Sequence, residues 1–392
     1  SGLTAAIEAA EVGHDVTLIE KNPYLGGRVS RMNSYFPKLC APDCGLEINF
    51  RRIKTNPRIS ILTQATVEDI SGQAGDYEVT VKVTPRKVKA SCTACGKCAE
   101  VCPVERDDER NYGMGKTKAI YLPGPMAFPM SYVIDTAVCQ GSACAKCVEA
   151  CPYGAIDLDM PEETLKLKAG AIVVATGWKP YDATKLDNLA FGRAANVITN
   201  VMMERLAAPD GPTGGKILRP SDGQPPKSVA FVQCAGSRDP DHLPYCSTVC
   251  CRATMKQILC AKELDEDVTC LVIYKDIRSP GQFEDLYRRV QDTPGVMFTK
   301  GEVASVDANG QVQIEVEETL IGERIRLEVD LLVLATGMVP ASADGEAIRR
   351  YRDAKAVLDN EEKVGAQREA AKATVDELEP IVGESILNPV SY

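Results

Sequence analysis

The residues with the clearest chemistry are cysteines: the chain has 16 of them, and 12 fall into three groups. The first group has the spacing C-x2-C-x2-C-x3-C, the second has C-x4-C-x2-C-x3-C, and a proline follows each. The third group is divided between the segments QCAGSRDP and YCSTVCC. In order, the groups are Cys92, Cys95, Cys98 and Cys102; Cys139, Cys144, Cys147 and Cys151; and Cys234, Cys246, Cys250 and Cys251. Thiolates are soft ligands, so clusters this tight favour metal binding over a framework of disulfides.

The first two groups predict two [4Fe-4S] clusters, because their spacing is that of bacterial ferredoxins, with two extra residues in the second group. Three thiolates of one motif surround one cluster, and the cysteine before the proline reaches the other cluster. The expected ligand sets are Cys92, Cys95, Cys98 and Cys151 for the first cluster, and Cys139, Cys144, Cys147 and Cys102 for the second. A zinc site would instead show paired C-x2-C knuckles. For the third group, spacing alone leaves two readings open: a further cluster, or buried free thiols.

The first residues of the chain predict part of a dinucleotide-binding unit. A helix over Leu3–Glu11 and a strand over Asp15–Ile19 form the second half of such a βαβ unit. Gly2 would be the last glycine of its fingerprint, and Glu20, 18 residues later, the carboxylate that accepts a ribose hydroxyl. The first strand and the first two glycines do not precede Gly2, so we expect the chain to be truncated at its N-terminus.

Three further segments favour FAD as the dinucleotide. EKNPYLGGR (Glu20–Arg28) resembles the stretch in two-dinucleotide-binding-domain flavoproteins whose glycines let the backbone approach FAD. AIVVATG (Ala171–Gly177) and LLVLATG (Leu331–Gly337) read as strands ending in Ala-Thr-Gly, a turn that this class uses against the cofactor. The candidate FAD-binding residues are Gly2, Glu20, Lys21, Gly26, Gly27, Arg28, Val67, Ala175, Thr176 and Gly177.

The second half of the chain predicts a nucleotide-domain fold without its phosphate loop. A strand over Ser228–Gln233 is followed by a helix over Thr254–Leu264 and a strand over Val268–Arg278. The turn after the first strand reads CAGSRD where a G-x-G-x-x-G pattern would bind a nicotinamide dinucleotide. We therefore do not expect an NAD(P) site here.

Net charge, the length of apolar runs and the number of histidines argue against several classes of function. The net charge is −10, which argues against a nucleic-acid partner, and no run of 18 apolar residues predicts a transmembrane helix. The two histidines, His14 and His242, offer little for acid–base catalysis. Cys40 and Cys44 remain open as a redox pair near the flavin, as a cap on a cluster, or as buried free thiols.

These motifs together resemble one family. LGGR, FPKLCAPDCG, two ferredoxin motifs inserted before an ATG turn, and QCAGSRDP with YCSTVCC look like the heterodisulfide reductase A family of flavin–iron–sulfur proteins. The resemblance implies FAD and a third [4Fe-4S] cluster at Cys234, Cys246, Cys250 and Cys251. Phe36–Ile53 and Asn200–Gly223 are most similar to a branch of it, in quinone-interacting membrane-bound oxidoreductase complexes of dissimilatory sulfur metabolism.

The resemblance also implies a role and partners. In that branch electrons pass between a quinone pool and adenylylsulfate reductase. The partners would be a second flavoprotein of the same kind and a membrane quinone-reactive haem/iron–sulfur subunit, which would hold the chain on the cytoplasmic side of the membrane. The alternatives are a soluble electron-transfer subunit of the heterodisulfide reductase kind, with or without electron bifurcation, an NAD(P)H-dependent flavin reductase, and a non-catalytic scaffold.

The predicted fold class is α/β: a Rossmann-like, thioredoxin-reductase-like flavoprotein with two dinucleotide-binding domains and an inserted α+β 2[4Fe-4S] ferredoxin domain. The first part of the FAD domain takes 1–88, and the insert takes 89–160. The expected continuation is 161–225 for the FAD domain and linker, 226–330 for the second nucleotide-domain-like module, 331–343 for the return to the FAD domain, and 344–392 for a charged helical segment.

Overall fold

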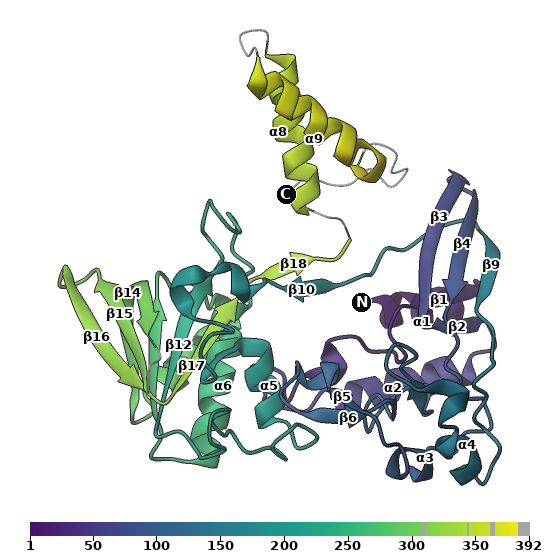
Figure 1. The fold of residues 1–392 in the computed structure, drawn as a ribbon. Coiled ribbons are helices and arrows are strands. Elements are labelled where there is room, and N and C mark those ends of the chain that lie inside the picture. Colours follow the sequence, from purple (N-terminus) through teal and green to yellow (C-terminus); the bar gives the residue numbers. More distant parts are fainter. Residues whose placement is uncertain (308–310, 343–344, 361–364, 383–392) are drawn as a thin grey trace.

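The computed structural model describes residues 1–392 except 308–310, 343–344, 361–364 and 383–392. Figure 1 shows two lobes and a helical hairpin. The first lobe carries strands β1–β9 and helices α1–α4, and the second carries the large sheet and helices α5–α7. Strands β10 (Trp178–Pro180) and β18 (Met338–Pro340) pair antiparallel in the connection between the lobes and the hairpin.

The first lobe begins with the predicted helix and strand. α1 (Gly2–Glu11) ends before Gly13, whose φ of +104° suits glycine, and β1 (Val16–Glu20) pairs parallel with β2 (Ile59–Thr63). α2 (Asp43–Thr55) lies between these strands in the sequence. One apolar core unites the helices with the segment after β1, through Ile7, Leu25, Leu46, Phe50 and Ile53.

A three-stranded antiparallel sheet carries the insert. Its order is β3 (Ala65–Gln73), β4 (Asp76–Val83) and β9 (Glu163–Ala169). The last residue of β4 lies opposite the first residue of β9, in the register Val83↔Glu163. The chain therefore leaves the sheet at the end of β4 and re-enters it at the start of the adjacent strand β9. Residues 84–162 are an insertion between these two strands.

The insert has little regular structure. Its elements are α3 (Lys97–Glu100), β5 (Glu105–Asp107), β6 (Lys116–Lys118), β7 (Ile120–Tyr121), β8 (Val133–Ile134) and α4 (Lys146–Ala150). Its core joins the buried residues Val88, Cys98, Ile120, Ile134, Ala155 and Ile156 to five further, partly buried cysteines.

The second lobe contains a seven-stranded sheet with the order β11-β17-β12-β13-β14-β15-β16. Its first five strands are parallel, which is the arrangement of a doubly wound nucleotide domain, and β14, β15 and β16 are antiparallel. Apolar clusters cover both faces of the sheet. The strands are β11 (Val197–Thr199), β12 (Ser228–Ala235), β13 (Thr269–Tyr274), β14 (Val296–Asp307), β15 (Val312–Glu318), β16 (Glu323–Val329) and β17 (Leu331–Thr336), and the helices are α5 (Asn200–Ala207), α6 (Cys250–Leu264) and α7 (Glu284–Gln291).

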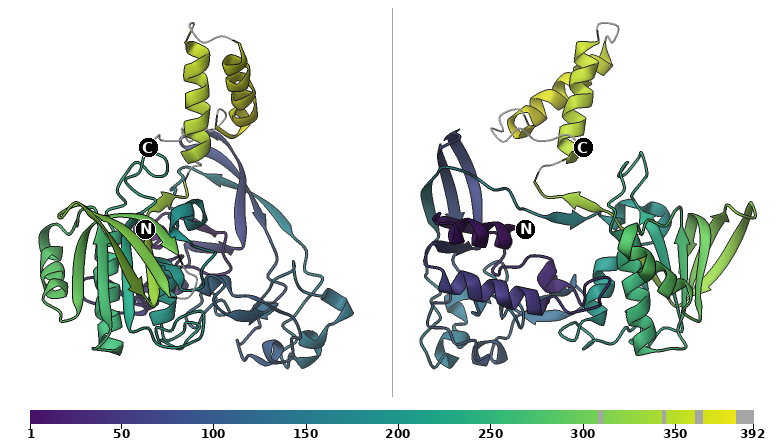
Figure 2. Two further views of the ribbon diagram at one scale, coloured as in Figure 1. Left: turned by 60° about the vertical axis from the view of Figure 1, so that its left-hand side comes forward. Right: turned by 180° about the vertical axis from the view of Figure 1, so that it is seen from behind.

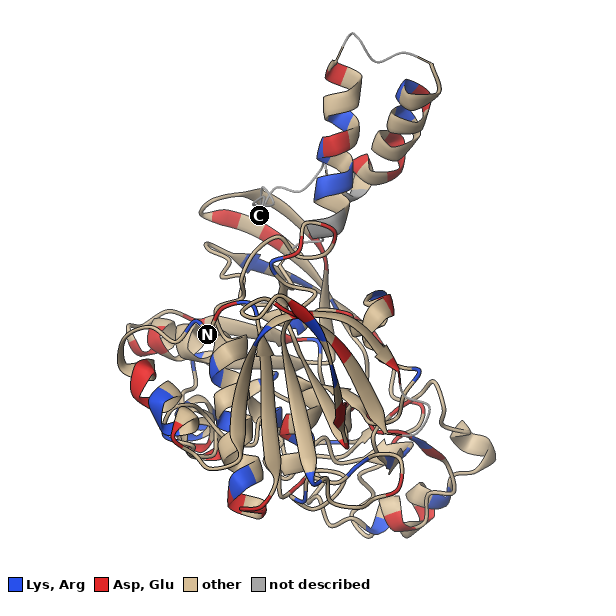
Figure 3. Cartoon of the chain, turned by 90° about the vertical axis from the view of Figure 1, so that its left-hand side faces the viewer, with Lys and Arg blue, Asp and Glu red and all other residues tan. Residues whose placement is uncertain are grey.

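The predicted charged segment forms a hairpin of α8 (Gly345–Asp359) and α9 (Ala366–Val382), which projects from the two lobes in both views of Figure 2. It has its own core, formed by Ala347, Tyr351, Ala354, Ala371, Val375 and Leu378. Both helices carry acidic and basic residues (Figure 3). The residues of the segment that fall at 344, 361–364 and 383–392 lie outside the described residues.

Three expectations from the sequence need correction. Residues 171–177 form no strand, and Val173 is 73% exposed, because no described strand lies alongside this segment to form a ladder with it. Leu331–Thr336 forms β17, which lies between β11 and β12 in the second lobe rather than in the FAD domain. β11 and α5 also pack in the second lobe, so this lobe takes in residues that the sequence pattern assigns to the linker before 226.

Candidate cofactor sites

The insert contains two hollows, and each is lined by cysteines from both ferredoxin motifs. Cys92, Cys95, Cys98 and Cys151 line the first hollow, together with Tyr132 and Tyr153. The second hollow is lined by Cys102, Cys139, Cys144 and Cys147, together with Gln140 and Lys146. This is the grouping that the crosswise ligand sets require.

Local backbone geometry orients these thiols. Ala94 and Gly141 have φ of +57° and +59°, and each donates its N–H to the sulfur two residues earlier, of Cys92 and Cys139, at 3.4 Å. Short helices follow in both motifs: Gly96 precedes α3 and Ala145 precedes α4, and both are left-handed. The two halves of the insert thus repeat one turn-and-helix arrangement.

Burial raises the pKa of the third cysteine in each ferredoxin motif. It raises the pKa of the Cys98 thiol to about 11, and the neighbouring thiols of Cys92 and Cys147 add to the rise. Burial also raises the pKa of Cys147, with further contributions from Cys139 and Cys102. These neighbours come from both motifs, so the two hollows lie close together in the insert.

The third cysteine group gathers at one end of the second lobe. Cys234 lies near the end of β12, Cys246 in the following loop, and Cys250 and Cys251 at the start of α6. Burial raises the pKa of Cys250 to about 12, followed in order by the effects of Cys251, Cys234 and Cys246. All four thiols are therefore close enough to affect one another electrostatically.

One turn of the third group has the geometry of the insert's turns. Thr248 has φ of +58° and donates its N–H to the Cys246 sulfur, two residues earlier, at 3.4 Å. Ala94 and Gly141 do the same for Cys92 and Cys139. Such a φ is uncommon for a residue with a Cβ, and for threonine it is strained. The shared conformation therefore sets Cys246 apart from Cys260 and Cys270, which are buried core thiols.

Polar atoms near this group lack partners. In the described part of the chain, seven buried side-chain atoms have no hydrogen-bond partner, and four of them belong to residues 233–252. Three can donate: Ser237 Oγ, Arg238 Nη1 and Arg252 Nε; the fourth is Gln233 Oε1. Buried donors without partners are rare and indicate an absent anionic or polar group.

The donor sets fit iron–sulfur clusters. Among the described side chains no three His, Cys, Asp or Glu residues are grouped to hold a single metal ion. A cuboidal cluster carries one thiolate on each of four irons, so its ligands line a hollow and do not converge on one point. Cysteines with N–H···S bonds, lining hollows, meet that requirement.

The structure brings some of the candidate FAD residues together. A Cβ placed on Gly2 would lie 3.2 Å from Cβ of Ala175, so the start of α1 closely approaches the ATG segment. Arg28 donates from Nε to the carbonyl of Trp178 at 2.7 Å and stacks on the Trp178 ring, 5.0 Å from its centre. The LGGR and ATG segments therefore meet.

The remaining FAD candidates make fewer contacts with one another. Glu20 ends β1, and its Oε1 accepts from the backbone N–H and the side-chain amide of Asn22 at 2.9 and 2.7 Å. Gly26 and Gly27 have φ of +99° and +54°, conformations that favour glycine. Three more candidates are joined to these by no described side-chain contact: Lys21 and Thr176, which are exposed, and Val67, which lies on β3 and is 44% exposed. Gly177 accepts from the backbone of Ala341 at 2.9 Å.

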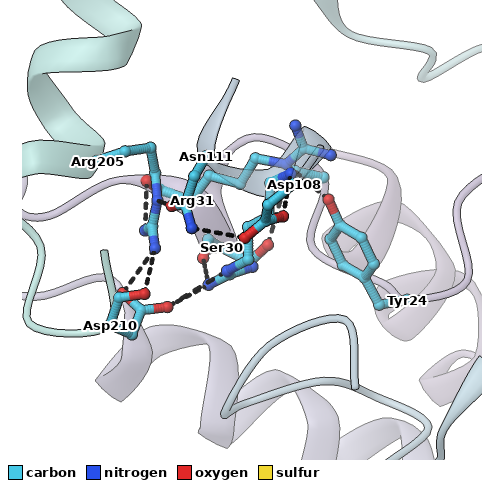
Figure 4. Close-up of polar contacts among 9 residues, drawn as sticks. Tyr24, Ser30, Arg31, Asp108, Asn111, Arg205 and Asp210 are labelled. Carbon is cyan, nitrogen blue, oxygen red and sulfur yellow. Dashed lines mark hydrogen bonds and ion pairs between the residues drawn. The ribbon is translucent and has the colours of Figure 1, made fainter. Parts of the chain in front are cut away.

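Sequence reasoning missed the polar junction that unites the parts (Figure 4). Arg205 of α5 is 1% exposed and donates to Asn111 Oδ1 of the insert at 2.9 Å and to the Arg31 carbonyl of the first lobe at 3.0 Å. Its Nη2 also pairs with Asp210 at 2.9 Å, and Asp210 in turn pairs with Arg110 of the insert at 2.8 Å. The only signal in the sequence was an arginine beside the apolar Met203 and Leu206 on a short helix.

A second buried contact joins the lobes. Lys256 of α6 is 1% exposed, pairs with Glu204 at 2.7 Å and donates to the Ser34 carbonyl at 2.8 Å. The loop that contains Ser34 continues to Cys40, which is exposed, as is Cys44. Both are free thiols.

The chain is similar to known proteins with a Rossmann-like fold. Residues 1–60 match a family model described as an NAD(P)-binding Rossmann-like domain. A crystal structure of thioredoxin reductase from T. acidophilum aligns with 87% of this chain and 74% of its own, at 11% identity and a TM-score of 0.43. The family-model match and the parallel sheet of the second lobe show a Rossmann-like fold.

Curated relatives then narrow the class. An A-type iron–sulfur subunit of CoB–CoM heterodisulfide reductase from Methanopyrus kandleri is 39% identical over 86% of this chain and 52% of its own length. The A-type subunit of a ferredoxin/F(420)H(2)-dependent CoB–CoM heterodisulfide reductase from Methanosarcina acetivorans is 41% identical over 88% and 44%. The chain is a relative of these heterodisulfide reductase A proteins, as its motifs predicted. It spans about half the length of the curated relatives it matches.

Within the described ranges, no helix is both long enough and apolar enough to cross a membrane.

Proposed function

We propose that the chain is an electron-transfer subunit of an oxidoreductase, of the heterodisulfide reductase A kind, which holds FAD and three [4Fe-4S] clusters. One observation carries the proposal: all three cysteine groups contain the same left-handed turn, with an N–H donated to a cysteine sulfur at 3.4 Å. The two hollows of the insert and the unpartnered donors near the third group support it.

The chain's residues would hold and separate these groups. When bound, FAD exchanges two electrons and each cluster exchanges one, so together they connect two-electron and one-electron carriers. Glu20 would accept a ribose hydroxyl, and Gly2 lets Ala175 of the ATG segment pack closely against the start of α1. The cysteines would bind iron as thiolates, and the N–H groups at Ala94, Gly141 and Thr248 would stabilise sulfur charge.

A second candidate is an NAD(P)H-dependent flavin reductase, which the Rossmann-like match of residues 1–60 favours. The second lobe argues against it. A phosphate-binding site needs a helix N-terminus directly after a strand, whereas β12 ends at Ala235 and α6 begins only at Cys250. Bleaching of the flavin by NADPH alone would favour the reductase.

A narrower proposal concerns the partners. The resemblance of Phe36–Ile53 and Asn200–Gly223 supports QmoA, the flavoprotein of this kind in a quinone-interacting membrane-bound oxidoreductase complex. Its partners would be a second such flavoprotein, adenylylsulfate reductase and a membrane quinone-reactive haem/iron–sulfur subunit. The curated relatives are named as subunits of heterodisulfide reductases, and so they favour the broader proposal.

The test is to load the chain with iron and sulfide under anaerobic conditions and to count iron, sulfide and flavin. We expect about 12 irons per chain, from about four per cluster. About four irons, or zinc in place of iron, would overturn the proposal. Cys151→Ala and Cys102→Ala should each remove one cluster of the insert, and the two variants should lose different EPR signals.

A further inference from the structure

One arginine lies directly beside the third cysteine group. Arg238 follows Cys234 in the turn after β12, and its side chain is 24% exposed. Its backbone N–H donates to the Tyr245 carbonyl at 3.1 Å, and its φ is +56°. Its Nη2 donates to Asp276 Oδ2 at 2.8 Å. The guanidinium is therefore fixed from both its backbone and its tip.

The charge of Arg238 reaches the thiols. The Arg238 side chain hydrogen-bonds the Cys234 thiol. The Cys251 thiol donates to the Asp276 carbonyl at 3.9 Å, so the residue that pairs with Arg238 also contacts a second thiol of the group. Arg238 Nη1 is buried and without a hydrogen-bond partner. One donor of the guanidinium thus remains for a group that the thiols would bind.

Asp276 does not cancel this cation by itself. The same carboxylate lies 3.8 Å from Nζ of Lys300, and Arg278 also lowers its pKa, after Arg238 and Lys300. Several cations therefore share the Asp276 carboxylate. Arg252, next to Cys251, adds a further cation, which packs against the rings of Phe36 and Phe283.

We propose that Arg238 tunes the third cluster: its charge, held beside Cys234 by Asp276, stabilises the reduced cluster and raises its midpoint potential. Adding one electron adds negative charge to the cluster and its thiolates, and a nearby partly buried cation favours that state. The inference rests on the third cluster of the proposed function.

The experiment is a mediated redox titration, followed by EPR, of the 392-residue chain loaded with iron and sulfide. The signal of the third cluster is the one that Cys246→Ser removes. In Arg238→Gln we expect the midpoint potential of the third cluster to fall. At a fixed potential the ratio of reduced to oxidised cluster should drop about tenfold, which corresponds to about 59 mV for a one-electron couple. Arg238→Lys keeps the charge and should retain most of the wild-type potential.

Arg219→Gln is the matched control. The Arg219 side chain is also 24% exposed, and it pairs with Asp330 at 3.0 Å and with Asp222 at 2.6 Å. Asp330 accepts from the N–H of Ser228, the first residue of β12, so Arg219 is at the opposite end of this strand from Arg238. This variant should leave the potential unchanged.

Asp276→Asn gives a test of opposite sign. It leaves Arg238 without its neutralising carboxylate, so the midpoint potential should rise. An Arg238→Gln protein with an intact third signal at the wild-type potential would overturn the inference. If that variant loses the cluster, an unchanged potential in Asp276→Asn overturns it instead. If wild-type protein has no signal that Cys246→Ser removes, the proposed third cluster itself is wrong, and this is known before any arginine variant is compared.

Discussion

The insert and the second lobe gather cysteines in different ways. Each hollow of the insert takes three cysteines from one motif and the fourth from the other, so its ligands span residues 92–151. The third group takes all four from residues 234–251, at the end of a seven-stranded sheet with its own apolar core. The insert has a small core in which cysteines are a large share. Clusters would therefore complete the fold of the insert, whereas in the second lobe a cluster would only be added to a fold that has its own core.

The largest expected effect follows from removing iron. A metal site in a small core supplies folding free energy directly, so a chelator should unfold the insert and leave the second lobe folded. Hydrogen exchange should show residues 84–162 losing protection while residues 228–336 keep most of theirs. Cys246→Ser, which affects only the third group, should leave the insert protected. Loss of both regions at the same chelator concentration would contradict the comparison.

The next effect concerns the junction that holds the insert. Arg205→Ala removes the buried donor of Asn111 Oδ1 and of the Arg31 carbonyl and leaves Asp210 paired with Arg110 alone. Each buried polar group left without its partner costs about 1–3 kcal/mol. Thermal unfolding should show the loss first in the insert. The control is Arg324→Ala, because Arg324 pairs with Glu317 on the surface with both side chains 60% exposed, and should change the free energy of unfolding by less than about 1 kcal/mol. Equal effects of the two variants would argue against the junction.

A buried thiol outside the ligand sets gives a pH test of the second lobe. Burial raises the pKa of Cys270 to about 12 from its ordinary value of 9.0. The unfolded thiol ionises above pH 9 while the folded one stays protonated, so this stability is present below pH 9 and is lost as pH rises toward 12. The free energy of unfolding should fall by about 1 kcal/mol per pH unit in that window from this group. Cys270→Val should reduce the slope, as measured by denaturant titration, and an unchanged slope would contradict the prediction.

The smallest effect sharpens the comparison of the turns. Thr248 is β-branched and left-handed, a conformation that costs about 1 kcal/mol or more, which glycine would relieve. Thr248→Gly should therefore stabilise the protein without iron by up to about 1 kcal/mol, whereas Gly141→Ala in the insert should destabilise it by a similar amount. Melting temperatures of both variants give the measurement, and destabilisation by Thr248→Gly would show that the threonine side chain has another role.

The sequence predicted the elements that depend on local pattern. The helix predicted over Leu3–Glu11, strand β1, and the strand–helix–strand order of β12, α6 and β13 follow from periodicity and propensity. The likeness to heterodisulfide reductase A proteins was recognised from the motifs. The predictions failed where pairing decided the structure. Residues 171–177 and 331–336 share a sequence pattern, yet only the second segment has neighbouring strands, and so only it is a strand.

Parts of the candidate site could not be predicted because they depend on distant contacts. Nothing near Arg205 in the sequence indicates Asn111, 94 residues away, and nothing near Lys256 indicates Ser34. The turn at Thr248 carries no glycine, so its left-handed backbone is visible only in the structure. Arg238, by contrast, lies within a motif that the sequence singled out, but its pairing with Asp276 required the fold.

The meeting of Val83 and Glu163 across two adjacent strands has a practical consequence. A short turn could join these two residues directly, so residues 84–162, with the two clusters proposed there, should be removable as a cassette that leaves the three-stranded sheet closed. The deletion would also remove Asn111, so Arg205 should be replaced at the same time. The same geometry would let the cassette be grafted into the β-hairpin of an unrelated flavoprotein, giving that host a route for single electrons.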